Sequence, residues 1–183
     1  EAFLVNSIYK LKDVQLPNFI FRNNRHLTFE DKSKEWGLNV PTFSNGTVTA
    51  DLDNDGDVDI VVNNIDQEAY LYENQLNLRK GVPTNHFINI VFEKNIAQSE
   101  RIGTKIWVFQ QDKNQFFEYS PYRGYKSTVD QDIHIGLGIN SSVDSLIIQW
   151  PDGKVQPVYH VKTDSEFILN KSESAFFYDG SYI

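Results

Sequence analysis

The sequence predicts an all-β protein in two parts, and three observations support this. Short runs of β-branched and aromatic residues recur along most of the chain, with turns rich in Gly, Pro, Asn and Asp between them. An acidic loop, Asp51–Asp59, lies between two of these runs. The segment Leu76–Asn85 holds a Gly, a Pro and polar residues. We interpret residues 76–85 as a linker between a first part, residues 1–75, and a second part, residues 86–183.

In the first part, residues 3–13 carry apolar side chains at helical spacing, which predicts a short helix. The pattern then changes to that of β-strands. Strands are expected at 19–21, at 27–29, at 47–50 before the acidic loop, at 60–62 after it, and at 69–72.

In the second part, seven further strands are expected, at 86–92, 104–109, 115–119, 133–135, 145–150, 154–160 and 166–169. The turn Trp150–Gly153 should join two of them, because Pro fixes φ at its second position and Asp-Gly accepts the remaining angles. Short strands at regular spacing predict a β-sandwich or a barrel.

The composition excludes several classes of protein. The 183 residues are 40% hydrophobic, enough for a core, and no run approaches the roughly 18 apolar residues of a membrane helix, so we expect no transmembrane segment in this chain. Cysteine is absent, which excludes disulfides and thiolate chemistry. The net charge is −8 and no basic stripe is visible, so nucleic acid is not an expected partner. The chain begins without Met, and we interpret it as a piece of a longer, processed precursor.

The acidic loop has the donor pattern of a calcium site. Aspartates at loop positions 1, 3, 5 and 9 offer carboxylates, the residue at position 7 offers its backbone carbonyl, and Gly56 at position 6 permits the sharp turn. The predicted metal residues are Asp51, Asp53, Asp55, Asp57 and Asp59, with the side chain of Asp57 pointing outward. The loop is not an EF-hand, because position 12 is Val62. The alternative is a solvated acidic turn.

The first part resembles one FG-GAP/VCBS-type repeat. The resemblance is carried by Phe19–Asn24, Leu27–Asp31, Trp36–Leu38 and Asp51–Asn64. It implies about one blade at the C-terminal end of a β-propeller, with the acidic loop as the calcium site, and earlier blades that precede this chain.

The second part resembles the ASPIC/UnbV domain, which follows VCBS repeats in exported bacterial proteins and in cartilage acidic protein. Over roughly residues 86–157, the resemblance is carried by Arg101–Val108, Arg123–Ser127, His134–Gly138 and Val143–Gly153. The chain departs from the family at Arg123, where glycine is frequent, and at Ile135, where phenylalanine is frequent. The resemblance implies the architecture and an extracellular setting.

Little else in the sequence indicates chemistry. Four well-separated histidines lack metal-ligand spacing, and no serine nucleophile motif occurs, so we expect no enzyme. Arg123 and Tyr125 form the one polar–aromatic cluster that could recognise a ligand, although a Tyr125 packed on the core and an Arg123 paired with an acid are the simpler explanation. Tyr119, Tyr122 and Tyr125 could also stack on a carbohydrate.

Together these patterns predict a non-enzymatic, calcium-binding module for adhesion or ligand binding, in an exported protein that is extracellular or on a bacterial cell surface. Its partner would be a protein or a carbohydrate. One alternative is an enzyme or accessory domain of a polysaccharide-processing system. The other is RNA binding, which the acidic composition disfavours.

Overall fold

The structure, a computed structural model, describes residues 14–24, 26–77, 85–111, 113–124, 127–129, 132–171 and 176–177. Almost all of its regular elements are β-strands, which confirms the predicted all-β class. The predicted helix at 3–13 lies outside the described residues. The chain divides into two compact units. One contains the residues up to Thr49 together with Ile60–Tyr72, and the other contains Ala50–Asp59 together with the chain from Glu73 onward.

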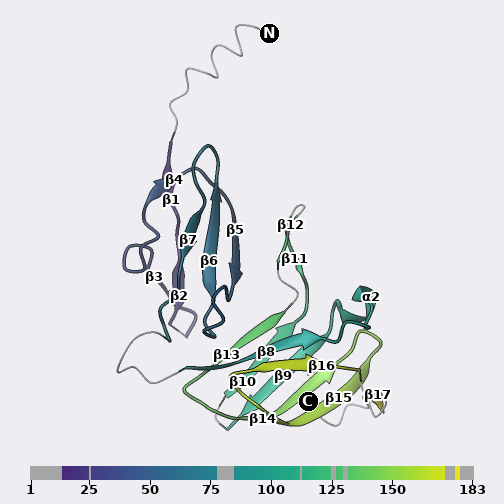
Figure 1. Ribbon diagram of the computed structural model, residues 1–183. Helices are drawn as coiled ribbons and strands as arrows, with labels where there is room; N and C mark the ends of the chain where they lie inside the picture. Colours follow the sequence, from purple (N-terminus) through teal and green to yellow (C-terminus); the bar gives the residue numbers. More distant parts are fainter. Residues whose placement is uncertain are drawn as a thin grey trace, which may run out of the picture. The chain divides into compact units, whose positions relative to one another are not determined.

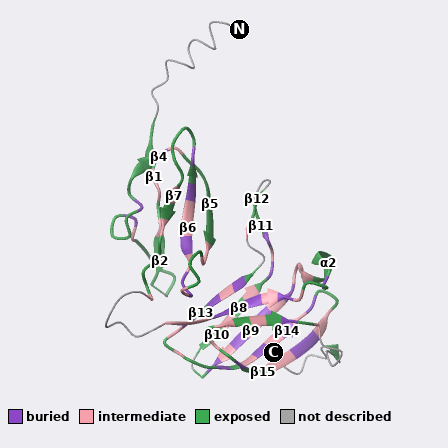
Figure 2. Cartoon of the chain, in the orientation of Figure 1, coloured by how far each residue is buried: buried purple, intermediate pink, exposed green. Residues whose placement is uncertain are grey.

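The first unit consists of short antiparallel elements (Figure 1). They are the hairpin β2 (Phe21–Asn23) and β3 (Phe29–Asp31), the pair β1 (Leu16–Pro17) and β4 (Pro41–Thr42), and a sheet in the order β5 (Ser44–Ala50), β6 (Asp59–Asn64) and β7 (Tyr70–Tyr72). Few of its apolar side chains are buried, Leu38 and Val62 among them. Figure 2 shows β5 as almost entirely exposed.

The second unit is built on two sheets. A three-stranded sheet has the order β13 (Ile133–Gly138), β8 (His86–Phe92) and β16 (Glu166–Leu169). A five-stranded sheet has the order β10 (Lys113–Glu118), β9 (Lys105–Gln110), β14 (Val143–Gln149), β15 (Lys154–Val161) and β17 (Phe176–Phe177). A hairpin of β11 (Tyr122–Gly124) and β12 (Ser127–Thr128) and one helical turn, α2 (Gln98–Arg101), complete it. The β8–β16 pairing is parallel, whereas the others in the two sheets are antiparallel.

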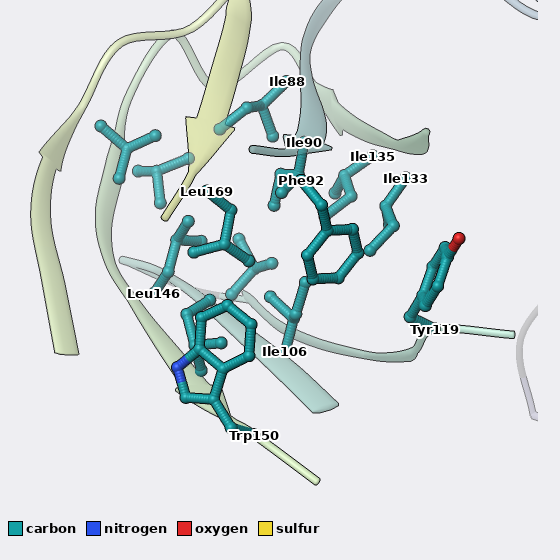
Figure 3. Packing of buried hydrophobic residues seen from close by; sticks show 14 of the residues in the cluster. Ile88, Ile90, Phe92, Ile106, Tyr119, Ile133, Ile135, Leu146, Trp150 and Leu169 are labelled. Carbon is teal, nitrogen blue, oxygen red and sulfur yellow. The ribbon is translucent and has the colours of Figure 1, made fainter. Parts of the chain in front are cut away.

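The inner faces of these two sheets share one hydrophobic core (Figure 3). Burial alternates along β8, β9 and β14, because successive side chains of a strand point to opposite faces. Ile88 and Ile90 of the smaller sheet thereby meet Ile106 and Leu146 of the larger one, and all four are fully buried. This arrangement is consistent with the predicted β-sandwich.

The predicted turn Trp150–Gly153 joins β14 to β15. The Trp150 N–H donates to the Lys154 carbonyl at 2.8 Å, and Gly153 takes a φ of 84°. The Trp150 side chain is buried in the core, and its Nε1–H donates to Gln156 Oε1 at 3.1 Å. The turn therefore closes a hairpin and also supplies the largest fully buried side chain of the described residues. Among those residues, no helix has the length and apolar character needed to span a membrane.

Candidate metal centre

The acidic loop connects β5 to β6, and its backbone takes conformations that suit a tight turn around an ion. Asn54 has a φ of 62° and Gly56 a φ of 87°, both in the left-handed region. Asn and Gly adopt this region more easily than other residues, so the sequence favours the observed turn. With these two left-handed residues, the loop turns so that the carboxylates of Asp51, Asp53 and Asp55 lie close to one another.

Three carboxylates converge in the loop. Asp51, Asp53 and Asp55 each offer an oxygen atom, and these oxygens lie within 4.8 Å of one another. The loop backbone holds each carboxylate through one oxygen. Gly56 N–H donates to Asp51 Oδ2 at 3.1 Å, Asp55 N–H to Asp53 Oδ1 at 3.3 Å, and Asp57 N–H to Asp55 Oδ1 at 3.0 Å. The second oxygen of each side chain is thus left for a ligand.

Asp57 and Asp59 have a different role from the other three. The Asp59 carboxylate accepts the Leu52 N–H at 3.1 Å and the Asn74 N–H at 2.8 Å, so both of its oxygens have partners. The predicted outward orientation of Asp57 is wrong, since only 5% of this residue is exposed. Its Oδ2 accepts the Asn77 N–H at 3.1 Å, which draws the side chain inward. Burial raises the pKa of Asp57, and repulsion from Asp55 and Asp59 acts in the same direction.

Four buried oxygen atoms in this region accept no hydrogen bond from the residues that the structure describes. They are Asp51 Oδ1, Asp55 Oδ2, Asp57 Oδ1 and Asn77 Oδ1. A buried acceptor without a partner costs about 1–3 kcal/mol, and more when it is charged. All four are acceptors, so they cannot satisfy one another, whereas a cation held where Asp51, Asp53 and Asp55 converge would satisfy the oxygens of Asp51 and Asp55. Carboxylate and amide oxygens without nitrogen or sulfur suit Ca²⁺ or Mg²⁺, and the residues present therefore fit the predicted calcium ion.

Within the second unit, the acidic loop packs against a pair of aromatic rings. The Phe87 ring lies directly against Gly56 and stacks on the His134 ring, with centroids 5.4 Å apart and planes inclined by 16°. His134 also makes a hydrogen bond with the Gly56 backbone. Burial lowers the pKa of His134, and the hydrogen bond and the charge of Asp51 only partly oppose this. His134 is thus a packing residue beneath the loop.

Asn74 and Asn77 are the site residues that sequence reasoning missed. Asn77 lies in the segment interpreted as a linker, yet it makes hydrogen bonds to Asp55 and Asp57, 22 and 20 positions away. The available signal was two asparagines, three positions apart, directly after a strand that neighbours the loop strand. Such a signal becomes specific only when the pairing of β6 with β7 is known.

Of the other proposed ligand residues, those that the structure describes are not brought together into a site. Arg123 is exposed and donates from Nη1 to the carbonyls of Ser120 at 2.7 Å and Tyr122 at 3.2 Å. Tyr125 lies outside the described residues. Tyr119 is buried in the core, so it cannot contribute to a carbohydrate-stacking surface. In the described part of the chain, no second group of three acidic, His or Cys side chains converges in this way.

Comparison with known proteins supports one of the two resemblances. Residues 94–175 match the family described as ASPIC and UnbV. This range covers β9, β10, β14 and β15 of the five-stranded sheet, together with β13 and β16, whereas β8 precedes it and β17 follows it. A search of curated proteins found no match.

Proposed function

We propose that this chain is a calcium-binding, non-enzymatic module of an exported protein, extracellular or on the cell surface, that contributes to adhesion or ligand binding. The ligands of the ion would come from Asp51, Asp53 and Asp55, with Asp57 and Asp59 shaping the loop around them. Calcium would supply the positive charge that the buried carboxylate oxygens lack. A protein or a carbohydrate is the proposed partner, and the net charge of −8 argues against nucleic acid.

The observation that carries this proposal is the set of buried acceptors without partners. An acidic turn that was merely solvated would expose its oxygens to water, whereas Asp57 is 5% exposed and four oxygens of this region are buried without hydrogen bonds. Burial of that kind is costly without a counter-ion. The three carboxylates within 4.8 Å of one another add a repulsion that a divalent ion would remove.

We further propose that residues 1–75 form an FG-GAP/VCBS-type blade at the end of a β-propeller. A three-stranded sheet whose first connection is the acidic loop supports this. So do the exposed aromatic side chains of Phe19, Phe21 and Trp36, which are 64%, 56% and 44% exposed. Apolar surface of this size is costly to leave in water, and neighbouring blades would cover it.

Calcium titration of the full chain tests the proposed metal site. Extracellular calcium sites have dissociation constants of about 10⁻⁴–10⁻³ M. At about 10 mM calcium, binding to the folded form then stabilises the protein by about 1.4–2.7 kcal/mol. For a chain of this size, this raises the melting temperature by roughly 3–11 °C. Calorimetry at the same calcium concentrations should show saturable heat.

Variants assign the effect to the loop. Asp53→Ala and Asp55→Ala should abolish both the heat and the shift in melting temperature, whereas Asp66→Asn, an exposed aspartate outside the loop, should keep them. Magnesium in parallel distinguishes a calcium site from a general response to divalent ions, because Mg²⁺ demands shorter bonds and octahedral geometry. Wild-type protein that shows neither heat nor a shift at about 10 mM calcium refutes the proposal.

A further inference from the structure

Asn77 lies after β7 and is held against the acidic loop by two hydrogen bonds. Its backbone N–H donates to Asp57 Oδ2 at 3.1 Å. Its side-chain Nδ2 donates to the Asp55 carbonyl at 3.3 Å. The carboxamide is therefore fixed beside two residues of the loop, and its orientation is set by a donor at one end.

The oxygen of that carboxamide has no hydrogen-bond partner among the described residues. Asn77 Oδ1 is buried and accepts no hydrogen bond from the described part of the chain. The other acceptors in the same condition nearby are carboxylate oxygens of Asp51, Asp55 and Asp57, the last of which belongs to a residue only 5% exposed. A buried amide oxygen without a hydrogen bond needs a donor or a cation as its partner, and amide oxygens are ordinary calcium ligands.

Asn74 provides an internal comparison, because it contacts the same loop and both polar atoms of its side chain have hydrogen-bond partners. Its N–H donates to Asp59 Oδ1 at 2.8 Å, its Nδ2 donates to the Val58 carbonyl at 3.3 Å, and its Oδ1 accepts the Leu76 N–H at 3.2 Å. Asn74 is thus a scaffold residue. Asn77 makes the same kind of donor contact through Nδ2, but its Oδ1 has no partner among the described residues.

We propose that Asn77 supplies an amide oxygen to the cation bound by the acidic loop. This rests on the calcium site proposed above and adds to it a ligand from outside the loop. Cation binding then fastens the segment after β7 onto the loop, because one ion joins Asn77 to Asp51, Asp53 and Asp55. The affinity for calcium depends on this segment as well as on the aspartates.

Calcium affinities of Asn77→Ala and Asn77→Asp, measured by calorimetry on the full chain, test the assignment. Both variants lose the Nδ2 donor to Asp55, but only Asn77→Asp keeps an oxygen at the ligand position. The repulsion between its carboxylate and the Asp55 carbonyl is an additional structural cost, which melting in chelator measures separately. We expect Asn77→Ala to bind calcium about tenfold more weakly. Asn77→Asp should bind as tightly as wild type or more tightly, since its carboxylate replaces the amide oxygen.

The control pair is Asn74→Ala and Asn74→Asp, which also lose a side-chain donor to the loop. Asn74→Asp should have no advantage over Asn74→Ala in calcium affinity, because Asn74 offers no free oxygen. Melting temperatures in chelator measure the structural loss of all four variants separately from binding. The assignment is overturned if Asn77→Ala binds like wild type, or if Asn77→Asp binds as weakly as Asn77→Ala. Wild-type protein that does not bind calcium overturns the proposed function and this assignment with it.

Discussion

Gly56 should be the position in the acidic loop that tolerates a methyl group least. It is buried, its φ is 87°, and a Cβ built on it would lie 2.9 Å from Phe87 Cζ and closer still to Cδ1 and Cε1 of the same ring. The ring cannot swing away freely, because it is stacked on His134. Gly56→Ala therefore introduces both backbone strain and a steric conflict.

The two effects can be sized separately. A residue with a Cβ in the left-handed region costs about 1–2 kcal/mol. Overpacking a filled site costs about 1–3 kcal/mol. Gly56→Ala should therefore lower the free energy of unfolding by about 2–5 kcal/mol. For a chain of this size, this corresponds to a fall in melting temperature of about 4–20 °C.

Thermal unfolding in the presence of chelator measures this loss without any contribution from calcium. Gly46→Ala is the matched control, since Gly46 has no positive φ and no atom within 4 Å of an added Cβ, and it should be close to neutral. In a double-mutant cycle, Phe87→Ala should recover the steric part, about 1–3 kcal/mol, and leave the backbone part. A Gly56→Ala variant as stable as Gly46→Ala, or a cycle without coupling, would refute the reasoning.

Two further predictions concern the second unit. Ile148→Ala should lower the free energy of unfolding, measured in urea, by about 2–5 kcal/mol, because this side chain is fully buried in the core. Ile168→Ala, at a residue that is 58% exposed, should lower it by less than about 1 kcal/mol in the same experiment. The hydrogen bond from Lys171 Nζ, at 2.8 Å, lowers the pKa of Asp152. This interaction therefore stabilises the fold above the ordinary pKa of an aspartate, and the stabilisation is lost as the pH falls through the lowered pKa. Asp152→Asn should therefore be less stable than wild type at neutral pH, by no more than about 1 kcal/mol because the pair is partly exposed. That difference should vanish in acid, and a difference independent of pH would contradict the assignment.

The sequence predicted the second unit better than the first because its strands are buried on one face. Strands β8 and β16 have the bounds expected from their residues, and β9, β14 and β15 differ from them by one or two positions. The alternation of apolar and polar side chains marks such strands clearly. β11, β12 and β17 were not predicted, since two or three residues are too few to show a period.

In the first unit, the hairpin strands β2 and β3 each begin two residues later than expected. Phe21 and Phe29 are both exposed in this hairpin, so burial does not fix its position along the chain. Strands β1 and β4 were missed, like the short strands of the second unit, because a two-residue pairing has no pattern of its own.

The candidate site was predictable where it is local and hidden where it depends on topology. Asp51, Asp53 and Asp55 follow one another in a loop, so spacing alone identified them. The contacts of Asn77 and the packing of Phe87 on Gly56 arise because distant segments return to the loop. The boundaries of an independently folding second part, placed at 86–183, remain a prediction, although the acidic loop groups with the second unit.

The pairing of β8 has a consequence for the order in which this protein can fold during synthesis. β8 lies in the middle of its sheet, and both of its partners, β13 and β16, are made much later. Phe87 and Asp164, which hydrogen-bond beside this pairing, are 77 positions apart. At about 5–20 residues per second, a ribosome needs roughly 4–15 s to cover that distance. During this interval Ile88 and Ile90, fully buried in the finished protein, have no completed sheet to enter. We therefore expect the nascent chain to leave these apolar residues without their sheet partners for several seconds, and apolar strands exposed in this way are prone to aggregate.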